Sequence, residues 1–155
     1  MASSMDGLDN VLRNLKDLPI KVRRNAVRRA TGKGASIIRR KARQNALLVD
    51  DPDTGRRIAD NIGQRFRSKY FRQTGDTMIS IGVLTTRGRI PRGNPDSGRR
   101  GNTPHWHLVE LGTERAKAQP FLRPAAQSSG AEVLNAIAKE LDLRVSLEVF
   151  RMRNK

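Results

Sequence analysis

The sequence predicts an α+β fold with two N-terminal helices, a small antiparallel sheet of three or four strands, and one long C-terminal helix packed on the sheet. Three observations lead to this prediction. Apolar residues recur every three or four positions near the N-terminus, alternate with polar residues in short central segments, and return to helical spacing after residue 121. The length of 155 residues fits a single domain, 1–155, of ordinary size.

The two N-terminal helices are predicted over residues 6–18 and from Pro19 to about Leu47. The apolar stripe of the first helix comprises Leu8, Leu12, Leu15 and Leu18. The stripe of the second comprises Val22, Ala26, Ala30, Ile37, Ile38 and Ala42. Gly32 and Gly34 weaken the middle of the second helix and mark either a bend or a close contact with another helix.

The sheet is predicted from the central part of the chain. A short helix is expected over residues 56–63, and Asp53 or Thr54 could cap it. The Thr74-Gly75-Asp76 segment supplies a hairpin turn. Strands are expected over about 64–72, 77–84 and 105–111.

The C-terminal part is predicted to be a helix over residues 122–140, with Pro124 in its first turn. Beyond it, apolar and polar residues alternate strictly, the apolar ones being Leu141, Leu143, Val145, Leu147 and Val149. This alternation favours a fourth strand, and a continued helix is the alternative.

The chain carries a formal net charge of +16, from 31 Lys and Arg against 15 Asp and Glu. Such a chain meets polyanions or acidic protein surfaces, with a merely solubilising surface as the alternative. Ten basic residues and no acidic one lie between Lys21 and Arg43, so a partner must supply the opposite charge. The candidate contact residues of this helix are Arg23, Arg24, Arg28, Arg29, Arg39 and Arg40.

Residues 85–104 are predicted to form a mobile basic loop that orders against a partner, because a segment rich in Gly, Pro and Arg cannot build a core. Its candidate DNA or partner contacts are Arg87, Arg89, Arg92, Arg99 and Arg100.

Several kinds of function are excluded by what the sequence lacks. The absence of cysteine excludes disulfides and thiolate metal sites, and neither a signal peptide nor a membrane span is expected. No phosphate-binding glycine loop or nucleophile elbow is found. Packing explains His105 and His107 better than a metal site does. We therefore expect no enzyme activity, no cofactor, no metal and no membrane partner.

The segment His107–Thr113, followed by Ala118–Ala125, resembles the neck or tail-completion family of long-tailed phages, which includes the lambda tail protein Z. In that family a strand ends in Glu-Phe-Gly-Thr, and Pro-Phe-Leu-Arg-Pro-Ala opens the last helix. Leu111 stands here in place of the aromatic residue. Asp53-Thr54-Gly55-Arg56 is similar to a second family segment, and the resemblance covers roughly residues 8–140.

The resemblance implies a structural virion protein that forms a ring around the DNA channel at the head–tail junction, after assembly in the host cytoplasm. Six copies are preferred because tails are sixfold, and twelve is the alternative. The implied partners are further copies of the chain, other phage neck and tail proteins, and genomic DNA contacted without sequence preference. A non-specific DNA- or RNA-binding protein of bacterial type fits the composition equally well and stays open.

The motif residues of the first segment are expected to act in the fold or at a subunit interface. They are Glu110, Gly112, Thr113, Pro120, Phe121, Arg123 and Pro124. The glycine can take a backbone turn closed to other residues, and the prolines stiffen the connection. The Glu110 carboxylate should accept a charge-assisted bond from an arginine of its own subunit or of the next one around the ring.

The net charge limits what DNA alone can neutralise. A ring one compact domain tall, about 40 Å, spans only about 24 phosphates of a duplex, whereas each copy carries +16. Most of the arginines must therefore face acidic proteins or solvent.

The prediction of a mobile loop can be checked by limited digestion with trypsin. Cleavage of the free protein is expected to concentrate between Arg87 and Arg100 and to disappear in assembled particles, because a loop that orders against a partner is no longer open to a protease. Equal protection in both states would contradict the prediction.

Overall fold

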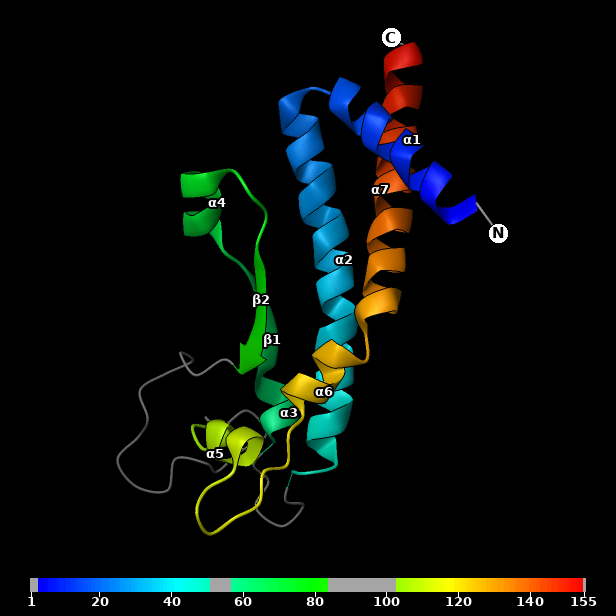
Figure 1. Ribbon diagram of the computed structural model, residues 1–155. Helices are drawn as coiled ribbons and strands as arrows, with labels where there is room; N and C mark the ends of the chain where they lie inside the picture. Colours follow the sequence, from blue (N-terminus) through cyan, green and yellow to red (C-terminus); the bar gives the residue numbers. More distant parts are fainter. Residues whose placement is uncertain (1–2, 51–56, 84–102, 155) are drawn as a thin grey trace. The chain divides into compact units, whose positions relative to one another are not determined.

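The computed structural model of the chain describes residues 3–50, 57–83 and 103–154 (Figure 1). Its described part is mostly helical, and β1 and β2 form one two-stranded antiparallel sheet. The expected three or four strands are therefore too many for these residues. The elements in chain order are α1 (Ser3–Asp17), α2 (Ile20–Leu47), α3 (Ile58–Asn61), β1 (Ile62–Phe66), α4 (Ser68–Thr74), β2 (Ile79–Val83), α5 (Trp106–Leu111), α6 (Leu122–Gln127) and α7 (Gly130–Arg153).

The chain divides into two compact units, each built from segments that are far apart in the sequence. The first unit comprises Met1–Gly34, Arg67–Ile79 and Ala131–Lys155. The second comprises Ala35–Phe66 and Ser80–Gly130. Each unit has its own buried apolar cluster, and α2 supplies residues to both.

The first unit buries one apolar cluster between α1, the N-terminal half of α2, and α7. In Figure 1, α7 runs antiparallel alongside this half of α2. Because Ala26 and Ala30 are small, α2 can approach its neighbours closely. The buried members of the cluster are Val11, Leu15, Leu18, Ala26, Ala30, Leu141 and Val145.

The two expected N-terminal helices are confirmed as α1 and α2, which are joined by a two-residue connection, Leu18 and Pro19. The Pro19 carbonyl accepts bonds from the amides of Val22 and Arg23 at 2.9 and 3.0 Å, and these bonds start α2. Arg23 Nη2 donates to the carbonyls of Lys16 and Leu18 at 3.3 and 3.4 Å. The arginine therefore satisfies carbonyls that the end of α1 leaves without a helical partner.

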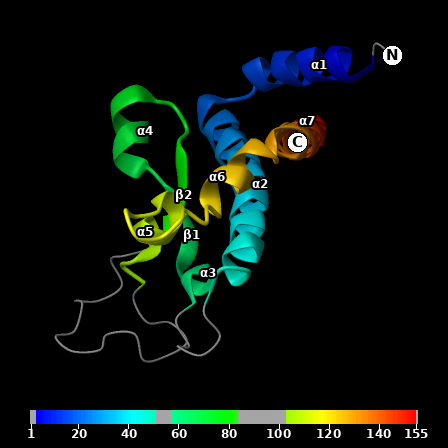
Figure 2. The same ribbon diagram turned by 60° about the horizontal axis from the view of Figure 1, so that its bottom comes forward.

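The second unit buries its cluster around the C-terminal part of α2, beside which α3 and α6 both lie in Figures 1 and 2. Phe121 is the largest fully buried side chain, and burying a phenylalanine contributes about 1.5–3 kcal/mol. The small Ala42 and Ala46 of α2 leave room for it in the same cluster. The buried members are Ala42, Ala46, Ile58, Ala59, Ile62, Phe121 and Ala125.

The strands β1 and β2 are joined by a helix, α4, rather than by the expected tight turn. The strand expected over 64–72 is too long, because the chain leaves β1 for α4 at Arg67. Gly75 ends α4 with a φ of 80°, and its amide donates to the Phe71 carbonyl at 2.9 Å. The Thr74-Gly75-Asp76 segment is thus a helix end of the kind that favours glycine. The second expected strand is confirmed as β2.

The segment expected as a third strand, 105–111, is the helix α5. Trp106 and Val109 both pack against the core of the second unit. Residues three positions apart share one face of a helix but lie on opposite faces of a strand. The helix therefore lets both side chains reach the same core.

The C-terminal helix is interrupted where the sequence predicted continuity over 122–140. Here α6 ends at Gln127, and α7 begins at Gly130. Pro124 lies in the first turn of α6, as expected. The interruption lies at Ser128 and Ser129, and serine competes for backbone bonds in a helix: Ser128 Oγ donates to the Pro124 carbonyl at 2.6 Å.

The fourth strand expected over 141–149 is also wrong, because α7 continues through it to Arg153. Leu141 and Val145 are four residues apart and both enter the buried cluster with α1 and α2. An ion pair between Arg144 Nε and Glu140 Oε1, at 2.8 Å, adds the i,i+4 support typical of a helix. The alternative reading of this segment, a continued helix, is confirmed.

The expected short helix is confirmed as α3, in a shorter form. The amides of Ile58 and Ala59 donate to the two carboxylate oxygens of Asp50, at 2.8 and 3.2 Å. Asp50 therefore caps α3 from eight residues upstream. The expected capping residues, Asp53 and Thr54, lie outside the described residues.

Gly34 marks a close approach between α2 and α7. A Cβ atom placed on it would lie 2.9 Å from Ile137 Cγ1 and 3.0 Å from Val133 Cγ1. A Cβ on Gly32 would make only an ordinary contact, 3.9 Å from Ile79 Cδ1. Of the two roles expected for these glycines, a close helix contact is the one found at Gly34.

We expect Gly34→Leu to destabilise the chain by about 1–3 kcal/mol, because the new side chain overpacks the α2–α7 contact. Gly32→Ala is the matched control and should be neutral or stabilise by up to about 1 kcal/mol, since alanine favours the helix and the space is open. Urea unfolding followed by circular dichroism measures both changes. A Gly34→Leu variant as stable as the wild type would contradict the close contact.

Candidate functional site

The residues of the sequence motif converge on the carboxylate of Glu110, which lies on α5 and is only 5% exposed. Glu110 Oε2 accepts bonds from the amides of Phe121 and Leu122 at 2.7 and 3.0 Å, and Oε1 accepts one from the amide of Arg123 at 3.0 Å. We call this arrangement the Glu110 cap. It places a negative charge at the N-terminus of α6, where the free amides of a helix favour one.

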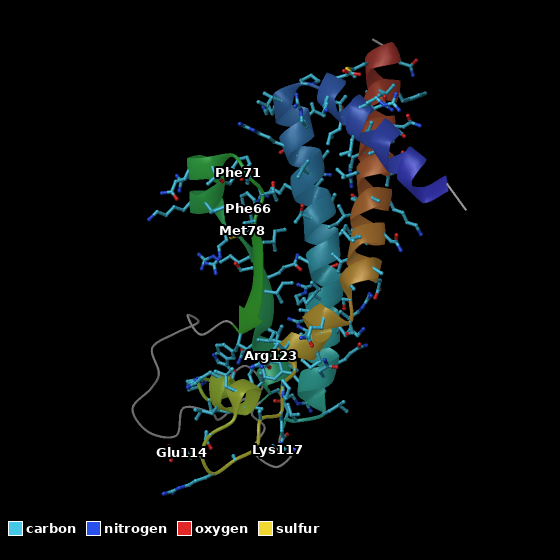
Figure 3. All side chains as sticks on the ribbon, viewed as in Figure 1. Phe66, Phe71, Met78, Glu114, Lys117 and Arg123 are labelled. Carbon is cyan, nitrogen blue, oxygen red and sulfur yellow. The ribbon has the colours of Figure 1, made fainter. Side chains whose placement is uncertain are left out.

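The expected arginine partner is present, but it is secondary to the backbone amides. Arg123 Nε lies 4.0 Å from Glu110 Oε1, and the arginine side chain is 62% exposed. Figure 3 shows Arg123 beside the start of α6. The amides and this arginine all belong to the same chain as Glu110, so these contacts account for the carboxylate without a neighbouring subunit.

Two prolines bracket the amides that the Glu110 cap uses. Pro120 precedes the first donor, Phe121, and Pro124 follows the last, Arg123. Proline has no N–H, so the three amides between the two prolines are the donors that this turn offers. All three donate to the single carboxylate.

The loop between α5 and α6 depends on Gly112 and Thr113. Gly112 has a φ of 79°, and a Cβ placed on it would lie 2.8 Å from the backbone nitrogen of Ala118. Only glycine fits this turn without strain, as the sequence indicated. Thr113 Oγ1 accepts bonds from the amides of Arg115 and Ala116 at 3.3 and 3.0 Å, which fixes the next turn.

Sequence reasoning missed two polar residues of α2 that hold this site in place. Asn45 Nδ2 donates to the Phe121 carbonyl at 3.1 Å. Arg43 donates through Nε and Nη2 to the Ile62 carbonyl at 3.0 and 2.8 Å. The available signal was their position beside the apolar stripe: Arg43 directly follows Ala42, and Asn45 directly precedes Ala46, which continues the four-residue spacing of the stripe.

Two of the basic residues expected to contact a partner, Arg23 and Arg24, make specific contacts inside the first unit. Arg23 bonds the end of α1, as described above. The guanidinium carbon of Arg24 lies 5.5 Å from the ring centroid of Phe71 on α4, a cation–π contact. Figure 3 labels Phe71 on this helix.

The remaining expected contact residues differ in what the structure says of them. Arg28 and Arg40 are exposed and also have partners within the chain. Arg29 is exposed, and Arg39 is half-buried. The five loop arginines lie outside the described residues, which end at Val83 and resume at Thr103: Arg87, Arg89, Arg92, Arg99 and Arg100.

The described residues contain neither a metal site nor a membrane span. Within residues 3–50, 57–83 and 103–154, no three His, Cys, Asp or Glu side chains are placed so that they could hold a metal ion. In the same part of the chain, none of the helices has the length and apolar character needed to cross a membrane.

We expect Glu110→Gln to lower the stability of the chain by about 2–4 kcal/mol, because bonds to a charged acceptor contribute about 1.5–3 kcal/mol each and the new amide group would face N–H donors. Thermal melting of the isolated protein, followed by circular dichroism, measures the loss. Unchanged melting would show that the Glu110 cap does not stabilise the fold.

Two control variants separate the backbone bonds from the arginine contact. Glu114→Gln removes a carboxylate from the exposed loop after α5 (Figure 3) and should change stability by less than about 0.5 kcal/mol. Arg123→Ala should cost only about 0–1 kcal/mol, since its side chain is largely exposed. A loss with Arg123→Ala as large as with Glu110→Gln would assign the main role to the ion pair.

Comparison with known proteins assigns the chain to a family. Residues 9–112 match the family model HK97-gp10_like, described as "Bacteriophage HK97-gp10, putative tail-component". The match runs from α1 to Gly112, and so includes Glu110 but not the segment whose amides it caps. No curated protein and no solved structure matches the chain. Because the match covers more than half of the sequence, the chain belongs to the HK97-gp10-like family of bacteriophage tail components.

Proposed function

We propose that this chain forms a closed ring of six copies at the head–tail junction of a tailed phage, around the channel through which DNA passes. Its role would be that of a neck or tail-completion protein, like the lambda tail protein Z group that the Glu110–Ala125 segment resembles. The observation that carries the proposal is the match of residues 9–112 to a family of phage tail components.

The Glu110 cap supports a structural role for this motif inside each subunit. Its hydrogen bonds join α5 to α6, and the Phe121 carbonyl between them is held by Asn45 of α2. A motif bonded in this way keeps the second unit in one conformation, which a repeating ring needs in every copy. The same residues then contribute to assembly by fixing the shape of the subunit.

The charge distribution supports partners of two kinds. The exposed arginines of α2, such as Arg28, Arg29 and Arg40, have no acidic residue between them in the sequence. We assign a minority of the basic residues to the phosphates of DNA in the channel, and the majority to acidic surfaces of neighbouring neck and tail proteins. DNA contacts of this kind involve phosphates rather than bases and carry no sequence preference.

The ring is tested with full-length protein purified free of nucleic acid. Native mass spectrometry should give six times the 17.3 kDa of one chain, and electron microscopy should show closed rings with a central channel. A mass of twelve chains would show that the proposed copy number is wrong but would still support a ring.

The same measurement distinguishes the proposed ring from the alternative, a non-specific DNA- or RNA-binding protein of bacterial type. Such a protein should remain monomeric in the absence of nucleic acid and gain mass only when a duplex or RNA is added. A chain that behaves in that way, and that also fails to enter virions, would overturn the proposed function.

A further inference from the structure

The helix α7 has a second apolar face that its own unit does not cover. Leu143, Leu147 and Phe150 are 51%, 41% and 65% exposed. They are spaced by four and three residues, so they share one side of the helix. We call these three side chains the outer face of α7.

The outer face lies opposite the buried face of the same helix. Leu141 and Val145 point into the cluster with α1 and α2, while Leu143 and Leu147 follow two positions later along the chain. At 3.6 residues per turn, two positions correspond to roughly half a turn. The strict apolar alternation that suggested a strand therefore gives this helix two apolar faces, one for its own unit and one without a described partner.

Of the outer face, Phe150 also lines a hollow of about 620 Å³ in the same unit. Leu18, Pro19, Val22 and Met152 supply the apolar part of its lining, and Glu148, Arg151 and Asn154 supply the polar part. Large apolar side chains that are exposed together on one surface mark a site of interaction with another protein. The surface is thus suited to another protein rather than to a polyanion.

The charge of α7 differs from that of the rest of the chain. Four acidic and four basic residues lie within Gly130–Arg153, so this helix has no net charge in a chain of +16. Two ion pairs form within the helix, Arg144 with Glu140 and Arg151 with Glu148, each at an N–O distance of 2.8 Å. An acidic partner would therefore find stronger electrostatic attraction along α2 than on this helix.

A second copy of the chain, unlike an acidic partner, should bind more readily on α7 than along α2. Two molecules of charge +16 repel each other where α2-like surfaces meet, because like charges in contact cost free energy. On the outer face of α7 the local repulsion is weaker, and burial of the apolar side chains favours contact. Of these two helices, α7 is therefore the one on which a second copy of this basic molecule meets less opposing charge.

We propose that the outer face of α7 is the surface on which the next copy of this chain sits. The inference rests on the proposed ring and specifies one side of its subunit contact. In a ring the contact is head-to-tail, so a different surface of the neighbour covers the outer face. Leu147 and Phe150 are its anchoring side chains.

The test compares full-length variants by native mass spectrometry and thermal melting. Leu147→Glu and Phe150→Glu should weaken association at least tenfold and leave monomers that melt like the wild-type monomer, because these side chains are exposed in the single chain. Leu134→Glu is the matched control. It makes the same change in the same helix at a leucine that is 69% exposed but lies off the outer face, and it should assemble as the wild type does.

The outcomes separate this inference from the proposed function. If the Leu147→Glu and Phe150→Glu variants form rings as the wild type does, the inference is wrong and the proposed ring stands. If these variants form rings but fail to enter virions, the outer face binds a different tail protein, which also overturns it. A wild-type chain that stays monomeric would remove the proposed ring and the inference with it.

Discussion

The packing of each unit depends on small side chains of α2. Ala26, Ala30 and Gly34 face the first core, and Ala42 and Ala46 face the second. Small residues let neighbouring elements approach the helix backbone closely, so the bulky side chains can come from elsewhere, such as Phe121. The remaining positions of α2 are then free to carry charge, which is why one helix can hold ten basic residues and contribute to two cores.

The Glu110 cap adds a polar constraint to this apolar framework. A buried carboxylate is destabilising unless it is well bonded, and here three consecutive amides supply the bonds. The same bonds satisfy the first amides of α6. The Glu110 side chain therefore stabilises its own buried charge and the start of the helix together. This arrangement fixes the connection from α5 to α6, which otherwise consists of a loop with little apolar content.

Charge and apolar surface are separated between the two long helices. The basic residues concentrate on α2, whereas α7 is neutral and presents an outer apolar face. In the proposed ring, α2 would contact acidic or nucleic-acid partners and α7 would contact the next copy. Their separation on two helices would let each kind of contact form without opposing the other.

The sequence alone determined the two N-terminal helices, β2, the turn at Gly112, and membership in a phage neck or tail family, because local spacing, glycine geometry and a short motif carry that information. The tertiary structure alone decided α5, the helical course of residues 141–149, and the donors that face Glu110. Trp106 and Val109 form a helix because both reach one core, and the Glu110 donors lie 11–13 residues away, beyond what periodicity reports. Apolar alternation after Leu141 fits a strand or a two-faced helix equally well, and packing against α1 and α2 selects the helix.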